Sequence, residues 1–257
     1  MTAAESSPTP SNQPVVDVRG LTIGWGDTVL AEDIAFHVDR GEVFAILGGS
    51  GSGKSTLLRF LVGLEAPTRG DIDVLGRGRP DLDRGLPPFG VMFQQGALFG
   101  SISTLDNVAL PLAEWTDLPP DAIEAIARAK LRLVGLEGAA DKLPTELSGG
   151  MKKRAAIARA LALDPPIVFL DEPSSGLDPI SSAEIDDLVL TLGRTMTLSV
   201  VLVSHEIESV LRIADRCILL DKDKKGIVAE GDPRALKESS DSRVFAFFNR
   251  APRQEGA

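Results

Sequence analysis

The chain lacks several features that mark other classes of protein. It has one cysteine, Cys217, in 257 residues, so an intrachain disulfide is excluded and a reducing compartment fits. Cys217 lies in an apolar run, and we expect a buried, unreactive thiol. No stretch of about eighteen uninterrupted apolar residues is present, and no basic region followed by an apolar stretch opens the chain. The sequence therefore predicts neither a membrane-spanning helix nor a secretory signal.

A basic excess is lacking as well. The 37 acidic residues outnumber the 27 lysines and arginines, and the net charge is −10. Non-specific binding to nucleic acid usually needs a basic patch or stripe, so we expect no nucleic acid partner. Hydrophobic residues at 43% and charged residues at 25% are ordinary for a globular domain, and the length allows one large core.

Strand and helix patterns alternate along the chain, which predicts an α/β fold. Residues 15–43 alternate short β-prone runs with turn residues and predict an antiparallel β subdomain. From about residue 96 to 163 the pattern changes to helices, with breaks at Pro111 and Pro119–Pro120, which predicts a helical subdomain inserted into the core. Strands are expected at residues 43–47, 71–75, 91–93, 166–170 and 198–204, with two more between 218 and 231. The clearest helices are expected at residues 55–64, 122–133 and 152–163.

No internal repeat is present, so we expect one domain over residues 15–250. Residues 1–14 are rich in serine, threonine and proline and predict a disordered leader. Residues 251–257 are expected to form a flexible tail.

A glycine-rich loop follows the strand expected at residues 43–47. Residues 48–55 read GGSGSGKS, and this strand, loop and helix match the phosphate-binding P-loop pattern in the context that the pattern requires. Glycines let the backbone wrap phosphates, a lysine supplies charge to the β and γ groups, and a serine offers a hydroxyl to Mg²⁺. We therefore expect ATP and Mg²⁺ as cofactors. The expected nucleotide contacts here are Gly48, Gly49, Ser50, Gly51, Ser52, Gly53, Lys54, Ser55 and Thr56.

A second glycine-rich loop, residues 147–151 with the sequence LSGGM, also opens a helix. Unpaired backbone N–H groups at the positive end of a helix dipole attract phosphate. In the simpler alternative, Ser148 only caps the helix that follows. Two phosphate-seeking loops in one small protein indicate that two copies meet face to face and share the nucleotide. A second copy of the chain is thus the first expected partner.

Two adjacent carboxylates, Asp171 and Glu172, end the strand at residues 166–170. Asp171 is suited to hold Mg²⁺ through water, and Glu172 to polarise an attacking water. Such a strand end is common and mostly structural when it stands alone. It gains meaning because residues 173–178, PSSGLD, follow directly.

In this order the motifs resemble those of the ABC (ATP-binding cassette) ATPases, over residues 15–250. The resemblance implies a P-loop NTPase fold with a RecA-like core, and it makes residues 147–151 the signature loop. Asp178 would contact the opposite subunit, and His205, 33 residues beyond Glu172, would sense the γ-phosphate. Gln94 would reach Mg²⁺ or the lytic water. Trp25 would stack on adenine, with a core or surface tryptophan as the alternative.

The resemblance assigns three sets of residues. The catalytic set is Glu172, His205 and Gln94, and the metal set is Ser55, Gln94 and Asp171. The nucleotide contacts outside the P-loop are Trp25, Ser148, Gly149, Gly150 and Asp178, of which Ser148 and Gly150 would grip the γ-phosphate of ATP bound to the other subunit. His37 has no partner motif, and we expect a structural role for it.

Finer features resemble the ATPases of bacterial Mla/Mce-type phospholipid transporters. These are residues 93–99 followed by 106–108, the stretch 146–151 in which Met151 replaces the common glutamine, and residues 240–248. The resemblance implies phospholipid movement between the inner and outer membranes by a homodimer at the cytoplasmic face of the inner membrane. Integral-membrane permease subunits would be partners, with Leu98 and Phe99 either touching them or packing in the core. Some relatives also bind a STAS-domain protein and an Mce-domain protein.

Two alternatives stay open. One is the ATPase of an ABC transporter for another cargo, such as amino acids or metals. The other is a soluble ABC ATPase that acts on DNA or ribosomes. About 94 residues separate Lys54 from Ser148, too few for the coiled coils of DNA-repair members, and a single cassette differs from the two of ribosome-acting members.

Overall fold

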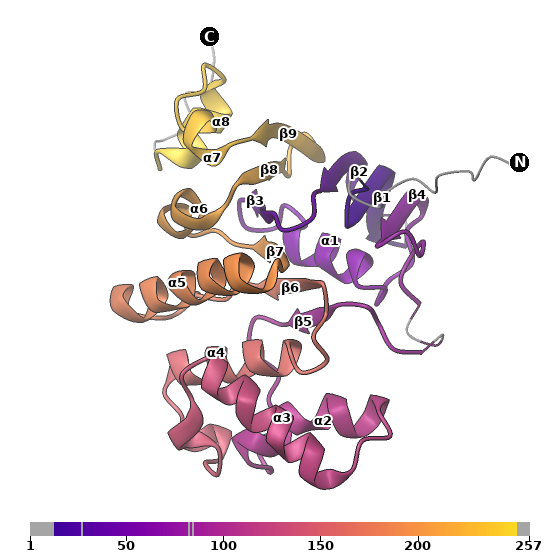
Figure 1. Ribbon diagram of the computed structural model, residues 1–257. Coiled ribbons are helices and arrows are strands. Elements are labelled where there is room, and N and C mark those ends of the chain that lie inside the picture. Colours follow the sequence, from indigo (N-terminus) through magenta and orange to yellow (C-terminus); the bar gives the residue numbers. More distant parts are fainter. Residues whose placement is uncertain (1–12, 27, 82, 84, 251–257) are drawn as a thin grey trace, which may run out of the picture.

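In the computed structural model the described residues are 13–26, 28–81, 83 and 85–250 (Figure 1). They contain a six-stranded sheet in the order β5-β6-β7-β3-β8-β9 and a three-stranded sheet in the order β2-β1-β4. In the larger sheet, β5, β6, β7, β3 and β8 run parallel to one another, and β9 pairs antiparallel to β8. Its strands are β3 (Val43–Gly48), β5 (Gly90–Met92), β6 (Ile167–Asp171), β7 (Ser199–Val203), β8 (Arg216–Asp221) and β9 (Gly226–Gly231). The expected α/β fold is confirmed.

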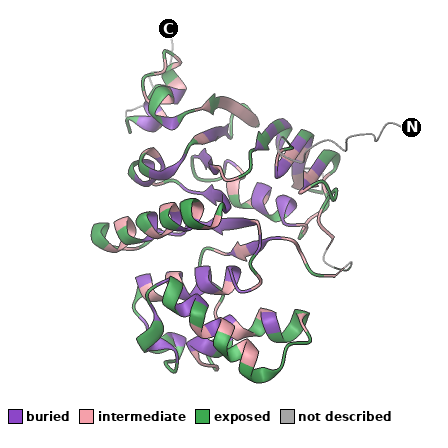
Figure 2. Ribbon diagram, in the orientation of Figure 1, coloured by how far each residue is buried: buried purple, intermediate pink, exposed green. Residues whose placement is uncertain are grey.

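Alternate residues of the larger sheet face two separate cores. Ala45 and Leu47 of β3 face one core with Leu170 of β6, whereas Phe44 and Ile46 face the other. Both faces are covered, and this explains why β3, β6 and β7 are continuous apolar runs in which every residue is buried (Figure 2).

The antiparallel sheet covers one face of the larger sheet together with helix α1 (Lys54–Leu61). Strand β1 (Val16–Trp25) pairs antiparallel with both β2 (Thr28–Val38) and β4 (Arg69–Val74). Rings of Phe36 and Phe44 stack at 5.3 Å between the two sheets. This packing places the β1–β2 hairpin beside the loop that leads into α1.

Helices α2 (Thr104–Trp115), α3 (Pro120–Leu133) and α4 (Gly149–Ala160) lie together at the bottom of Figure 1. The chain breaks at Pro119–Pro120 as expected, but the break expected at Pro111 is wrong because α2 continues through it. The loss of one backbone hydrogen bond is offset by Val108 and Leu112, which are buried on the inner face of α2.

Other helices cover the second face of the larger sheet and the C-terminal end of the described chain. They are α5 (Pro179–Met196), α6 (Ile207–Ile213), α7 (Pro233–Leu236) and α8 (Ser242–Phe248). Short 3-10 turns at Glu137–Ala139 and Pro144–Glu146 lie between α3 and α4. Cys217 is fully buried in β8, and burial raises the pKa of its thiol to about 12, as expected for an unreactive cysteine. No helix in the described ranges combines the length and apolarity needed to cross a membrane. The tail expected at residues 251–257 and all but residues 13 and 14 of the leader lie outside the described residues.

Candidate nucleotide site

The phosphate loop joins the carboxyl end of β3 to the first turn of α1. Gly53 caps α1 with φ 94° and offers no side chain to the helix N–H groups, which stay open to an anion. A Cβ on Gly48 would lie 2.3 Å from Ser52 Oγ and 2.7 Å from the carbonyl oxygen of Leu220, so only glycine fits there. Ser52 Oγ is buried without a hydrogen-bond partner among the described residues. The loop thus has the geometry of a phosphate cradle.

Lys54 lies folded back over this loop. Its Nζ donates to the carbonyl oxygens of Gly48 at 2.9 Å and Gly49 at 3.1 Å. Burial lowers the pKa of Lys54, while the nearby carboxylates of Glu172 and Asp171 oppose that change. The ammonium is therefore held by weak backbone partners in a position from which it can turn to a phosphate.

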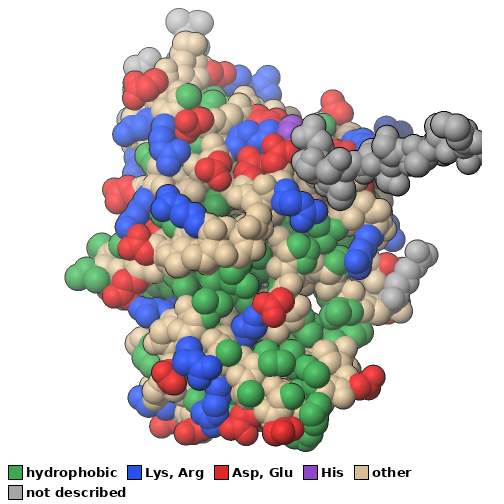
Figure 3. Space-filling model, in the orientation of Figure 1, with side chains coloured by type: hydrophobic (Ala, Val, Ile, Leu, Met, Phe, Trp, Pro, Cys, Tyr) green, Lys and Arg blue, Asp and Glu red, His purple; other side chains and the backbone are tan. Residues whose placement is uncertain are grey.

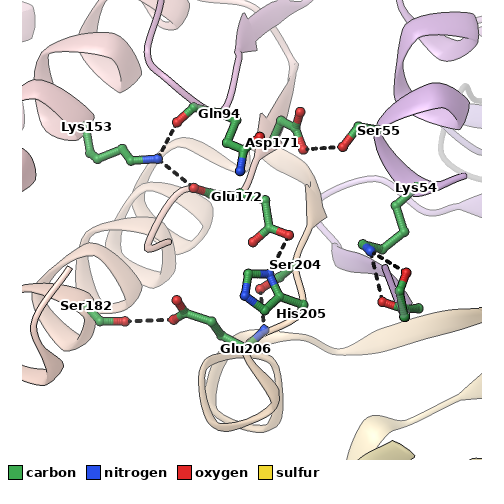
Figure 4. Close-up of polar contacts among 12 residues, drawn as sticks. Lys54, Ser55, Gln94, Lys153, Asp171, Glu172, Ser182, Ser204, His205 and Glu206 are labelled. Carbon is green, nitrogen blue, oxygen red and sulfur yellow. Dashed lines mark hydrogen bonds and ion pairs between the residues drawn. The ribbon is translucent and has the colours of Figure 1, made fainter. Parts of the chain in front are cut away.

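Ser55 in the first turn of α1 and Asp171 at the end of β6 form a pair of oxygen groups. Ser55 Oγ donates to Asp171 Oδ1 at 3.2 Å (Figure 4). Burial raises the pKa of Asp171, and the Ser55 hydrogen bond opposes this rise. The described residues include no group of three or more His, Cys, Asp or Glu that could hold a metal by themselves. One carboxylate and one hydroxyl suit Mg²⁺, which keeps several waters and takes further oxygens from phosphates.

Glu172 follows β6 in a left-handed backbone conformation, with φ 51°. Its amide donates to the carbonyl of Val203 in β7 at 2.9 Å, and its Oε1 lies 2.7 Å from His205 Nδ1 (Figure 4). Its Oε2 is buried and has no hydrogen-bond partner among the described residues. A buried carboxylate oxygen without a partner is costly, so this atom marks a place for a water or a polar ligand.

Gln94 lies two residues beyond β5, with its side chain exposed. Its carbonyl accepts a hydrogen bond of 2.5 Å from Lys153 Nζ, which also donates to the Glu172 carbonyl at 2.7 Å. Sequence reasoning missed Lys153. The available signal was a lysine aligned with Ala156 and Ile157 on the buried face of α4.

The signature loop packs against the segment that follows Glu172. Ser148 caps α4 by accepting from Met151 N at 3.3 Å, so the capping alternative describes a real contact. Ser148 and Gly149 are nevertheless exposed, and a Cβ on Gly149 would lie 3.2 Å from Leu177. The loop's glycine N-terminus therefore faces the surface beside residues 173–178 of the same chain.

Asp178 caps α5 and lies in this second group with Ser148, Gly149 and Gly150. It accepts from Ile180 N and Ser181 N, each at 3.1 Å, and from Ser181 Oγ at 2.6 Å, and these bonds lower its pKa. Thus the structure brings Lys54, Ser55, Asp171, Glu172, His205 and Gln94 together at the carboxyl ends of the parallel strands, and it places the signature loop with Asp178.

Trp25 ends β1 and is 50% exposed, which excludes the core alternative. Its hairpin lies beside the phosphate loop, because Ile23 Cδ1 is 3.5 Å from the Cβ position of Gly53.

His37 contacts Arg216, with Nε2 3.2 Å from Nη1, in keeping with a structural role.

An apolar groove lies between α2 of the helical part and the segment that leads into β5. It has a volume of about 270 Å³ and includes Leu64, Phe89, Pro111 and Trp115. Figure 3 shows hydrophobic side chains gathered on this side of the molecule over α2 and α3. Leu98 packs partly buried against the core, whereas Phe99 is 55% exposed.

Comparisons with known proteins agree with these features. The ABC transporter family model matches residues 31–175. The chain is 43% identical over 242 residues to the intermembrane phospholipid transport ATP-binding protein MlaF of Haemophilus influenzae, covering 92% of this chain and 91% of that protein. It is 39% identical to the probable ribonucleotide transport ATP-binding protein mkl of Mycobacterium leprae, covering 91% and 68%. Its fold matches the dimeric ATP-binding cassette MJ0796 in a post-hydrolysis state bound to ADP and Pi, with a TM-score of 0.74, 31% identity and coverage of 85% and 99%.

Proposed function

Because the chain belongs to the ABC transporter family and is one of its ATPases, we propose that it powers the transport of phospholipids or related lipids between inner and outer membranes. Similarity to MlaF along nearly the whole of both chains supports this cargo. The observation that carries the hydrolytic chemistry is the partnerless Oε2 of Glu172, buried beside His205 at the mouth of the phosphate loop.

The nucleotide is held from three sides. Backbone N–H groups of residues 48–56 and the ammonium of Lys54 bind the β and γ phosphates. The exposed ring of Trp25 stacks on adenine, a contact that favours nucleotides in general. Phosphates held in this way would lie near the strand ends that carry Asp171 and Glu172, whose carboxylates act on the Lys54 ammonium.

Ser55, Asp171 and Gln94 would hold the Mg²⁺ that accompanies ATP. Their hard oxygen atoms fit this ion, and the ion supplies neutralisation of charge on the β and γ phosphates. Glu172 orients the attacking water with Oε2 and accepts its proton as the terminal phosphate bond breaks. His205 contacts the Glu172 carboxylate through Nδ1 and would sense the γ-phosphate with its other side.

Two copies of the chain share each nucleotide. Dimeric relatives of the same fold support the pairing. Ser148, Gly149 and Gly150 present the open N-terminus of α4 to the γ-phosphate bound by the second copy, and Asp178 contacts that copy beside them. ATP therefore closes the dimer, and hydrolysis opens it again.

The dimer works at the cytoplasmic face of the bacterial inner membrane with integral-membrane permease subunits. A permease segment fills the groove at Pro111 and Trp115, and the exposed side chain of Phe99 is a further contact for it. The finer partners that the Mla/Mce resemblance implies, a STAS-domain protein and an Mce-domain protein, belong to the same proposal.

Purification from native membranes in mild detergent tests this function. We expect an integral-membrane permease to accompany the chain and phospholipids to be found by mass spectrometry.

The name of the mkl relative favours a second candidate cargo, ribonucleotides. ATP hydrolysis by the purified complex should rise with phospholipid vesicles and not with added ribonucleotide monophosphates. Copurification with only ribosomal or DNA-bound proteins overturns the transporter proposal.

A further inference from the structure

We propose that Lys153 is a positioning residue that ties the helix behind the signature loop to Glu172 and Gln94 of the same chain. This inference rests on the proposed function, because it concerns how one subunit's ATP site responds to its signature helix. It assigns to Lys153 the task of keeping the two residues aligned as α4 moves.

The contacts of Lys153 join three elements. Lys153 lies in the first turns of α4, and its Nζ reaches the Gln94 carbonyl at 2.5 Å and the Glu172 carbonyl at 2.7 Å (Figure 4). Gln94 and Glu172 are 59 and 19 positions away from it in the sequence. One ammonium group therefore bridges the two loops that follow the paired strands β5 and β6.

The burial of this ammonium makes its position well defined. Lys153 is 9% exposed, and burial lowers its pKa while the carboxylates of Glu172 and Asp171 oppose that change. A buried charge is costly unless hydrogen bonds satisfy it, so Nζ is restrained to the two carbonyl oxygens. If α4 shifts, these carbonyls must follow or the ammonium loses its partners.

A small movement of the Glu172 carbonyl is expected to change the position of the Glu172 side chain. Glu172 has φ 51°, a conformation that costs a residue other than glycine free energy and must be held by its surroundings. Its carbonyl also accepts from Ser175 N at 3.3 Å, so it begins the turn through residues 173–178. Rotating this peptide re-aims the Glu172 side chain and its partnerless Oε2.

Helix α4 also holds the segment after Gln94. Arg159 donates to the carbonyls of Gly96 and Ala97, both at 2.8 Å, and a Cβ on Gly96 would lie 3.2 Å from Ala156. Arg159 thus fastens Gly96 and Ala97 to α4, and Lys153 extends the same attachment to Gln94 and Glu172. Because α4 starts at the signature loop, Lys153 links a subunit's own site to the loop that serves the other site.

Steady-state ATP hydrolysis by the full chain tests this role. Lys153→Met should lower kcat about 100-fold, since misplacing a catalytic group by about 1 Å has an effect of this size. Affinity for a fluorescent ATP analogue should change less than about twofold, because neither carbonyl belongs to the phosphate loop. Lys153→Arg keeps the charge and several donors and should recover most of the lost kcat.

Lys130→Met is the matched control. Lys130 is a buried lysine in α3 that pairs with Asp164 and does not touch the site. It should lower the melting temperature and keep kcat within about twofold. Should Lys153→Met not fold, Lys153→Gln is judged by the same criteria.

A folded Lys153→Met protein with wild-type kcat overturns the inference. So does a Lys153→Arg protein no more active than Lys153→Met at equal melting temperature, or an equal loss of kcat in Lys130→Met. A wild-type chain that does not hydrolyse ATP, or one that Glu172→Gln leaves unchanged, refutes the proposed function instead.

Discussion

Replacing Glu172 by Gln should abolish turnover while it leaves ATP binding intact. The substitution keeps the shape of the side chain, and the amide oxygen can still face His205 Nδ1, now 2.7 Å from Oε1. The amide nitrogen then takes the place of Oε2, the buried atom without a partner, and cannot accept a proton from water. The phosphate loop and Lys54 are untouched.

The size of the effect follows from the role of the lost group. A positioned general base contributes about 100- to 10,000-fold to rate, which corresponds to about 3–5.5 kcal/mol of transition-state stabilisation. Because the other phosphate contacts remain, the ATP-bound closed dimer should accumulate. Analytical ultracentrifugation with ATP and Mg²⁺ should show a species of twice the 27.2 kDa chain mass, and it should decline when ATP is removed.

Glu42→Gln is the control for the loss of a buried carboxylate. Glu42 has a 10% exposed side chain and lies 2.9 Å from Arg216 Nε, outside the site. The Glu42→Gln substitution should lower the free energy of unfolding and leave the rate of ATP hydrolysis unchanged. Full turnover by Glu172→Gln, or dimer accumulation to the same extent in wild-type and variant chains, refutes the assignment of Glu172 as the base.

Three more expectations concern the same site. Trp25→Ala should weaken ATP binding about 5- to 150-fold by isothermal titration calorimetry, since aromatic stacking contributes about 1–3 kcal/mol per base; unchanged affinity contradicts the stack. Mixing Lys54→Ala chains with Ser148→Arg chains should restore hydrolysis that neither has alone, because one shared site is then free of both changes. No recovery at any ratio contradicts sharing. Asp171→Asn should lose Mg²⁺-dependent hydrolysis yet raise the melting temperature near pH 7. Burial raises the folded pKa of Asp171 above 3.8, so its charged form opposes folding at neutral pH, and the gain should shrink as the pH falls through that pKa toward 3.8. An equal gain at all pH values contradicts this cause.

The sequence predicted those parts of the site that depend on adjacent residues. The phosphate loop needs its glycines and Lys54 in consecutive positions, and Asp171 and Glu172 follow one apolar strand, so both were visible in the chain. Lys153 was not, because its partners are backbone carbonyls, which every residue carries and which leave no mark in a sequence. Its placement depends on how the helical part folds against the sheet.

The fold shows the same division. Continuous apolar runs predicted the buried strands because both faces of the sheet are covered. The break predicted at Pro111 was wrong. The lost backbone hydrogen bond is a local cost that the sequence shows, whereas the burial of Leu112, which stabilises the helix, depends on tertiary packing. Helix α5 was missed although Ile185, Val189 and Leu192 recur at helical spacing, because Leu188 and Leu190 lie between them and obscure that spacing.

The buried thiol of Cys217 makes the natural chain a ready host for site-specific labelling. A sulfhydryl that is fully buried and has a pKa of about 12 carries almost no thiolate at neutral pH, so maleimide and spin-label reagents do not react with it. A cysteine placed at an exposed position such as Ser101 or Glu238 becomes the sole reactive sulfur without any prior removal of a native one. Distances between two copies through an ATP cycle can therefore be followed by pulsed resonance or energy transfer on a chain with a single added mutation.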